Sequence, residues 1–191
     1  MNFLVDFINS INLTPQESIE KLLSLIKLQE LKKGDNIALT GEIPKDIFII
    51  KSGIIRSFHI DEKGKEYIRH FFTPIKATGA LRALILNKPS RLSYDCLTNC
   101  EVYAINYKDF KKLTEKDKNI VNLYAKILEY IFIALEAKIY DLSVLNATER
   151  YLKLKTQIPG IENLIPQYHI ASYLNITAVQ LSRIRKEIYS K

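Results

Sequence analysis

The residues with the clearest chemical meaning lie near the end of the chain, after Thr177. Gln180, Arg183 and Lys186 recur every three residues, so a helix over this stretch would present them on one face. Arginine can pair bidentately with guanine, and both lysine and arginine hold phosphates. A major groove admits one helix, so this face, with Arg185 towards its side, could read a DNA duplex.

Two helices joined by a tight turn would position that face. Ala171 is small enough for a second helix to cross closely, and Asn175 tolerates the left-handed conformation that such a turn requires. Thr177 is then the N-cap of the second helix. The apolar positions that would fill the angle between the helices are Ile170, Leu174, Ile176, Leu181, Ile184 and Ile188. The alternative is an ordinary helical hairpin with a solvated basic face.

The distribution of charge is consistent with a polyanionic partner but does not prove one. The 191 residues contain 28 Lys and Arg against 21 Asp and Glu, a net charge of +7. Residues 148–191 hold seven of the basic side chains and three of the acidic ones. Concentrated positive charge favours nucleic acid because each neutralised phosphate releases counterions. A solvated basic surface would have the same composition.

A long helix is predicted in front of the basic end. Residues 114–146 contain neither proline nor glycine, and their apolar residues recur at helical spacing on two faces. Two apolar faces need two burial surfaces, which we assign to the middle of the chain and to the same helix of a second subunit. The predicted dimer contacts are Val121, Tyr124, Leu128, Ile131, Leu135 and Leu142. A core helix in a monomer is the alternative.

The middle of the chain reads as short strands. Turn glycines at 34, 41, 53 and 64 separate β-rich segments at 47–50, 54–60 and 67–72, and a further strand pair is expected near 93–97 and 101–105. This spacing indicates an antiparallel sandwich or barrel. A short helix is predicted over 80–86, and an N-terminal helix is predicted to begin at Pro15, capped by Thr14, and to extend to Ile26.

These three parts, in this order, resemble the Crp/Fnr-type superfamily of transcription regulators. The segments that carry the resemblance are Lys33-Gly34-Asp35, Gly41, residues 47–56, Gly64 and residues 165–188. The resemblance implies an α+β chain whose antiparallel β-roll, a double-stranded β-helix of the cyclic-nucleotide-binding type, covers residues 1–112. A long dimerisation helix over 113–147 and a C-terminal helix-turn-helix without a wing over 148–191 follow.

The resemblance also implies a homodimer that reads two half-sites about 34 Å apart. Carried over by position, the base contacts fall on Ala178, Val179, Ser182 and Arg183; the family often has Glu where this chain has Val179. The candidate DNA contacts are Gln167, Thr177, Ala178, Val179, Gln180, Ser182, Arg183, Arg185 and Lys186. The implied partners are double-stranded DNA and, for an activator, RNA polymerase.

The sensor pocket departs from the pattern of cyclic-nucleotide-binding relatives. Those proteins use a Gly-Glu pair followed by Arg-Ser or Arg-Thr, whereas here Gly79 precedes Ala80, and Arg91 is separated from Ser93 by Leu92. Ala80 cannot accept a hydrogen bond from a ribose hydroxyl. We therefore expect no cyclic AMP, and either an unidentified small-molecule effector or none.

Other function classes find little support. Cys96 and Cys100 are too few for an iron–sulfur cluster, so we expect no metal and no cofactor. A cupin-like enzyme would need converging His and Glu ligands, but only His59 and His70 lie in the predicted roll, so we expect no enzyme. The remaining alternative is an effector-sensing or protein-interaction module that has lost specific DNA binding.

The sequence also indicates where the protein works. The start lacks the basic stretch and long apolar run of a secretory signal. No stretch reaches 18 uncharged apolar residues, the length that a membrane-spanning helix needs. We therefore predict a soluble cytoplasmic protein without a membrane partner.

Overall fold

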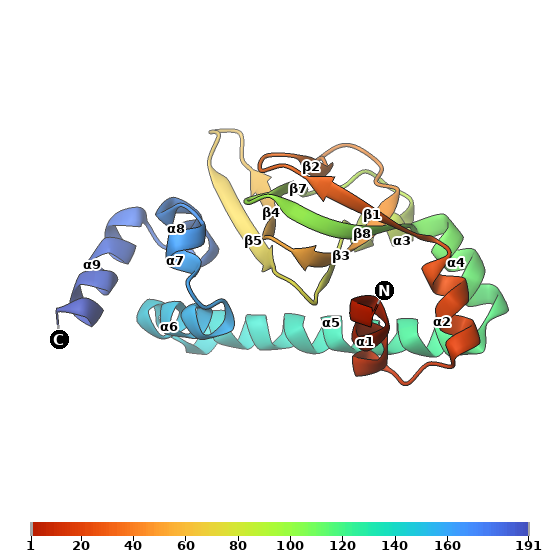
Figure 1. Ribbon diagram of the computed structural model, residues 1–191. Coiled ribbons are helices and arrows are strands. Elements are labelled where there is room, and N and C mark those ends of the chain that lie inside the picture. The colour runs from red at the N-terminus through yellow and green to blue at the C-terminus, as the bar shows by residue number, and fades with distance from the viewer. Residues whose placement is uncertain (1, 191) are drawn as a thin grey trace.

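The computed structural model describes residues 2–190, which form a β-roll, one long helix beneath it and a group of short helices at one end (Figure 1). Two helices, α1 (Asn2–Ile11) and α2 (Gln16–Leu23), precede the roll. A six-residue helix, α3 (Leu81–Leu86), interrupts it where a short helix was predicted. The α+β fold class, with an N-terminal antiparallel β-roll, is confirmed.

The β-roll consists of two four-stranded antiparallel sheets. One has the order β1-β8-β3-β6 and the other the order β2-β7-β4-β5. The strands are β1 (Ile26–Leu31), β2 (Asn36–Ala38), β3 (Asp46–Ser52), β4 (Ile55–Ile60), β5 (Glu66–Phe72), β6 (Ala77–Thr78), β7 (Ser93–Cys96) and β8 (Cys100–Asn106).

Alternation along β3 separates two of the hydrophobic clusters of the chain. Phe48 and Ile50 lie in the cluster between the sheets, together with Ile55, Cys96 and Val102. Ile49, between them in sequence, lies in the cluster formed with residues of α1, α2 and the long helix. Because successive side chains of a strand point to opposite faces, one strand contributes to both clusters. β3 therefore joins the core of the β-roll to the helices that pack against it.

The N-terminal helix is shorter than predicted. It ends at Leu23, and Ile26 is the first residue of β1, where it pairs with Ile105. Thr14 does not cap the helix: the N-cap is Pro15, without a side-chain cap, and the Thr14 hydroxyl donates to the Asn12 carbonyl at 2.8 Å. Strand pairing therefore overrides the helical spacing of the apolar residues at this point.

The long helix is also shorter than the stretch free of proline and glycine. It is split at Asp117 into α4 (Tyr107–Lys116) and α5 (Lys118–Val144). Asp117 has an extended backbone, its carboxylate accepts from the Asn119 amide at 3.0 Å, and the Ser18 hydroxyl donates to it at 2.9 Å. An aspartate that caps a new helix start ends the previous helix. With 27 residues, α5 is about 40 Å long.

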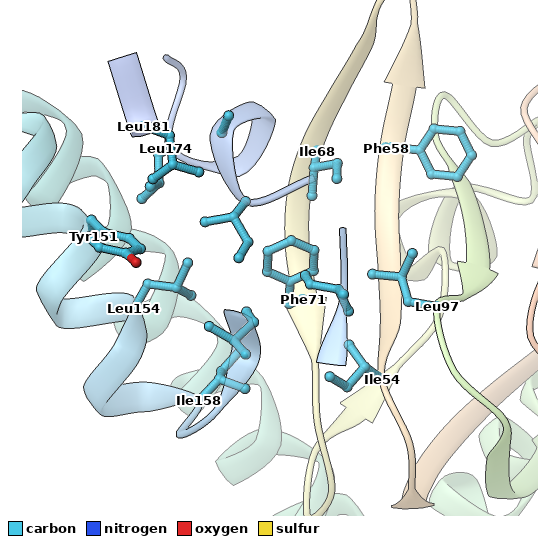
Figure 2. Close-up of a cluster of buried hydrophobic side chains, with 14 residues drawn as sticks. Ile54, Phe58, Ile68, Phe71, Leu97, Tyr151, Leu154, Ile158, Leu174 and Leu181 are labelled. Atoms are coloured by element: carbon cyan, nitrogen blue, oxygen red, sulfur yellow. The ribbon is translucent and has the colours of Figure 1, made fainter. Parts of the chain in front are cut away.

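Four helices follow α5: α6 (Ala147–Gln157), α7 (Ile161–Leu164), α8 (Gln167–Tyr173) and α9 (Ala178–Tyr189). They pack against the roll through what we call the bridging cluster (Figure 2). Its strand-side members are Ile54, Phe58, Ile68, Phe71 and Leu97. Its helix-side members are Tyr151, Leu154, Ile158, Ile161, Ile165, Ile170, Ala171, Leu174 and Leu181. Among residues 2–190, no helix is both long and apolar enough to cross a membrane.

One glycine of the roll is predicted to be irreplaceable. Gly53 has φ +92°, and a Cβ there would overlap with the Asn99 carbonyl oxygen and the Cys100 sulfur. Gly53→Ala should therefore cost about 1–2 kcal/mol for the left-handed backbone and about 1–3 kcal/mol more for the overlap. Gly64→Ala is the matched control, because Gly64 has φ +78° and open space around it. Urea unfolding should give a clearly lower midpoint for Gly53→Ala; equal midpoints would contradict the clash.

Candidate nucleic-acid interface

The turn between α8 and α9 has the geometry that the sequence predicted. Asn175 has φ +55°, in the left-handed region. Thr177 caps α9: its hydroxyl accepts from the Gln180 amide at 3.1 Å, and the Gln180 side chain accepts from the Thr177 amide at 2.8 Å. This reciprocal capping box fixes the direction in which α9 leaves the turn.

The inner face of the α8–α9 pair is closed by apolar side chains. Ala171, Leu174 and Leu181 are buried, and Ile184 and Ile188 are half-buried against them. The small side chain of Ala171 lets the two helices approach each other closely. The apolar pattern that predicted this helical pair is confirmed.

The outer face of α9 is open. Ala178, Val179, Ser182, Arg183 and Lys186 are all exposed, on a helix that lies at the end of the molecule remote from α1 (Figure 1). Two basic side chains, one hydroxyl and two small apolar side chains therefore share an exposed surface that nothing in the described chain covers. Such a surface can contact both phosphates and base edges.

Besides Thr177, three predicted contact residues already have partners within the chain. The Gln180 carboxamide is held in the capping box. Gln167 is half-buried at the start of α8, where its Nε2 donates to the Glu162 carbonyl at 3.1 Å. Arg185 forms an ion pair with Glu162, with 3.1 Å between Nε and Oε1. The outward row consequently centres on Arg183 and Lys186.

Glu162 on α7 was not singled out from the sequence, yet it ties α9 to the rest of the helical group. It accepts hydrogen bonds from the hydroxyls of Tyr151 and Tyr189, the latter at 2.7 Å, and pairs with Lys155 at 3.2 Å. Burial raises the pKa of Glu162, but the hydrogen bonds from the two tyrosines and Lys155 outweigh it and lower the pKa to about 2. Its partners are remote in sequence, so no local pattern reveals it.

An open groove adjoins the outer face of α9. It runs between the start of α6 and α9 and is lined by Asn146, Ala147, Thr148, Gln180, Arg183 and Ile184. Asn146 caps α6 through a second capping box with Glu149. The polar lining continues the exposed surface of Arg183 towards α6.

The four candidate effector residues lie on two segments, one before α3 and one before and within β7. Gly79 and Ala80 lie immediately before α3, and Ala80 is buried against Ala83 and Tyr94. The Ser93 hydroxyl accepts from the Thr40 amide at 3.1 Å, whereas Arg91 is exposed on the loop before β7. Cys96 and Cys100 are free and buried, and the described residues contain no cluster of three or more metal-binding side chains.

The residues assigned to the dimer helix separate into two groups. Val121, Leu135 and Leu142 are exposed and Leu128 is half-exposed on α5. Tyr124 instead packs within the chain: its ring meets Phe110 edge-on at 5.3 Å, and its hydroxyl lies 3.1 Å from that of Tyr107. Ile131 is partly covered. The prediction also left out Phe132 and Ile139, which are 70% and 66% exposed.

A second group that the sequence did not reveal joins α8 to the roll. Arg56 of β4 and His169 of α8 are both buried, and an Arg56 Nη1 lies 3.0 Å from His169 Nδ1. Ser172 of α8 hydrogen-bonds to the backbone of β5. Polar residues of the sheet and of the helix pair thus meet at the margin of the bridging cluster.

Two comparisons with known proteins give matches. One match covers the roll, and the other covers most of the chain. Residues 28–117 match the cyclic nucleotide-binding domain family. No curated protein matches the chain. Most of its length does match solved structures, at identities that establish the fold alone.

Three of these structures cover most of the chain. FixK2 from Bradyrhizobium japonicum is 18% identical with a TM-score of 0.72, covering 86% of this chain and 85% of its own. A putative transcriptional regulator of the Crp/Fnr family from Eubacterium rectale is 13% identical with a TM-score of 0.73, covering 92% and 84%. The c-di-GMP-responsive regulator CLP from Xanthomonas campestris is 14% identical with a TM-score of 0.70, covering 92% of both chains.

The Glu162 cluster generates a prediction about pH. Glu162→Gln should lower the free energy of unfolding by about 1–3 kcal/mol at pH 7, because a half-buried charged acceptor is lost. The lowered pKa means that this stabilisation is complete above about pH 4.5 and disappears as the pH falls towards about 2. Denaturation at a series of pH values should therefore show the two curves converging. Glu187→Gln, at an exposed position of α9, should change little at any pH.

Proposed function

We propose that this chain, whose residues 28–117 match the cyclic nucleotide-binding domain family and most of whose length shares the fold of Crp/Fnr-type structures, is a homodimeric, sequence-specific DNA-binding transcription regulator. Residues 1–112 would form the sensor, 113–147 the dimerisation region and 148–191 the DNA-binding region. Double-stranded DNA is the partner, with RNA polymerase as a second partner if the protein activates.

The observation that carries this proposal is the difference between the two faces of α9. Its inner face is buried, while Val179, Ser182, Arg183 and Lys186 point outward together. Arg183 can donate two hydrogen bonds to guanine, and Val179 can contact a thymine methyl group. Lys186 is suited to a phosphate, because a lysine is a flexible point charge.

A second copy of the chain fits the exposed side of α5. The positions 121, 125, 128, 132, 135, 139 and 142 alternate by four and three residues, and Val, Ala, Leu, Phe, Leu, Ile and Leu occupy them. This is the heptad spacing of a two-stranded coiled coil. A parallel pair of α5 helices would present two α9 helices related by a twofold axis, as a palindromic operator requires.

The sensor is proposed to act without cyclic AMP. Ala80 offers no acceptor for a ribose hydroxyl, and its side chain is buried against Ala83 and Tyr94. Arg91 lies apart on an exposed loop. A different small molecule, or none, would then govern the protein.

Binding to genomic DNA fragments across a salt series tests the function. Fluorescence anisotropy should show strong selection of particular fragments, with affinity falling steeply as salt rises because counterions are released. Equal, fragment-independent binding would instead favour a sensing or interaction module that has lost specific DNA binding.

Two basic residues on α9 should behave differently in that assay. Arg183→Ala should cost about 1–3 kcal/mol and relax discrimination at one base pair in each half-site. Lys186→Ala should weaken all sequences alike and reduce the salt dependence. Competition against single-base operator variants separates the two effects, and identical behaviour of both variants contradicts the assignment of Arg183 as a base reader.

Charge placed on the α5 seam should separate the subunits. Leu135→Lys puts a lysine at the centre of the proposed interface and should convert dimer to monomer in light scattering. Ile133→Lys is the control, because Ile133 is also exposed but lies on a different side of α5. An unchanged mass for Leu135→Lys, or an equal loss in both variants, contradicts this interface.

A further inference from the structure

Helix α8 covers one edge of the sheet β2-β7-β4-β5. β5 is the outermost strand on that side, so its outward backbone groups need partners. The Ser172 hydroxyl supplies them, accepting from the Ile68 amide at 3.0 Å and donating to the Glu66 carbonyl at 2.8 Å. One side chain of the helix pair therefore takes the place that a neighbouring strand would occupy.

Arg56 lies beneath this contact, with its guanidinium held in a fixed position. Its Nε and Nη2 donate to the Asp95 carboxylate at 2.7 and 3.0 Å, it also donates to Glu66, and it stacks 4.0 Å above the Phe58 ring. Arg56 is only 6% exposed. Bidentate pairing orients the planar group, so the Nη1 that reaches His169 has a defined direction.

The geometry determines the protonation state of His169. A guanidinium only donates hydrogen bonds, so the Nδ1 atom that lies 3.0 Å from Arg56 must accept one. An imidazole that accepts at Nδ1 is neutral and carries its proton on Nε2. A protonated His169 would place a second cation against the buried arginine and lose the acceptor that Arg56 uses. Glu66 Oε2, 3.8 Å from Nδ1, lies beyond hydrogen-bond distance and already accepts from Arg56.

We propose that Arg56, on the sensor sheet, is a positioning residue for the outward face of α9, acting through neutral His169 on α8. The contact fixes α8 on the sheet, and α9 follows because a tight turn joins the two helices and Leu174 and Leu181 pack in the same cluster. The contact is argued from the chain alone; only its consequence for DNA reading rests on the proposed function.

The contact is sensitive to protons. The charged groups that face His169 are Arg56 on β4, Glu66 on β5, Asp95 on β7 and Lys33 in the loop after β1. Burial and Arg56 lower the pKa of His169, Glu66 and Asp95 raise it, and Lys33 lowers it, with a net value of about 4. A histidine released from the contact titrates near 6.5. Docking is therefore complete above about pH 6.5 and weakens about tenfold between pH 7.5 and 5.5.

The Ile68 amide reports docking directly, because its hydrogen-bond acceptor is Ser172 of α8. In the full-length protein without DNA, amide hydrogen exchange followed by NMR gives its protection factor, corrected for the intrinsic effect of pH. We expect the wild-type protection factor to fall about tenfold from pH 7.5 to 5.5. A protection factor that does not change between these pH values overturns the proposal.

Two histidine variants test whether His169 causes the fall in Ile68 protection. His169→Gln keeps an acceptor for Arg56 but does not titrate, so Ile68 should remain protected at both pH values. His70→Gln is the matched control: His70 is on β5 and its pKa is also lowered, by burial, to about 4, but it makes no contact with Arg56. The control should keep the wild-type fall. Retention of that fall in His169→Gln contradicts the role of this residue.

An arginine variant tests the positioning step itself. Arg56→Lys keeps the charge but cannot bond Asp95, Glu66 and His169 together, so Ile68 should lose protection already at pH 7.5. Amides of β3 and β8, in the other sheet, monitor whether the roll remains folded. Unchanged Ile68 protection in a folded Arg56→Lys variant overturns the proposal.

Titration with a selected DNA fragment at both pH values separates this inference from the proposed function. Positioning predicts that specific affinity follows the docked fraction, which the Ile68 protection factor reports, and that His169→Gln removes any pH dependence arising from docking. A protein that docks as described but selects no DNA supports the contact and overturns the regulator proposal. A folded Arg56→Lys variant that has lost Ile68 protection but selects DNA as tightly as the wild type overturns the positioning role.

Discussion

The architecture depends on one constraint, the open edge of β5. An edge strand must pair with another strand, be covered or be otherwise protected, and here α8 covers it. Once Ser172 is bonded to the β5 backbone, the apolar residues on both sides can only meet as they do in the bridging cluster, where Ile68 and Phe71 of the strand face Leu174 and its neighbours (Figure 2). The helix pair is consequently part of the same packed body as the roll.

That arrangement explains why only one face of α9 is free. Leu181 is buried in the bridging cluster, and Glu162 holds Arg185 and Tyr189 from the side. With its inner face and one flank occupied, α9 can present only the surface that contains Arg183 and Lys186. Three kinds of interaction determine its orientation: apolar burial, the capping box and the Glu162 cluster. A surface held in this way loses little conformational entropy on binding, which is the condition for accurate reading of a rigid partner.

Much of this structure could be predicted from the residues, because it depends on local order. Turn residues and periodicity indicated the roll, Asn175 and Thr177 indicated the turn, and the apolar spacing indicated the inner face of the helical pair. What failed depended on partners remote in sequence. Nothing near Asp117 shows that Ser18 will hold its carboxylate and help to end a helix, and Arg185 resembles a free basic residue until Glu162 is known. Gln180 is the exception, because its capping partner Thr177 is only three residues away in the sequence.

Arg56 is a further residue whose environment depends on partners remote in sequence. A charged residue on a strand suggests a solvent-facing position, and only the assembled sheet shows that Asp95 and Glu66 neutralise it under a covering helix. A buried charge is tolerated only when it is paired and hydrogen-bonded, so the sheet β2-β7-β4-β5 cannot change the position of this arginine without changing what His169 meets. Leu97 and Ile54, at the ends of β7 and β4, belong to the bridging cluster, so the apolar part of the contact also depends on the position of these strands. Any rearrangement of these strands must therefore change the packing of α8, because α8 contacts them directly and not through the long helix.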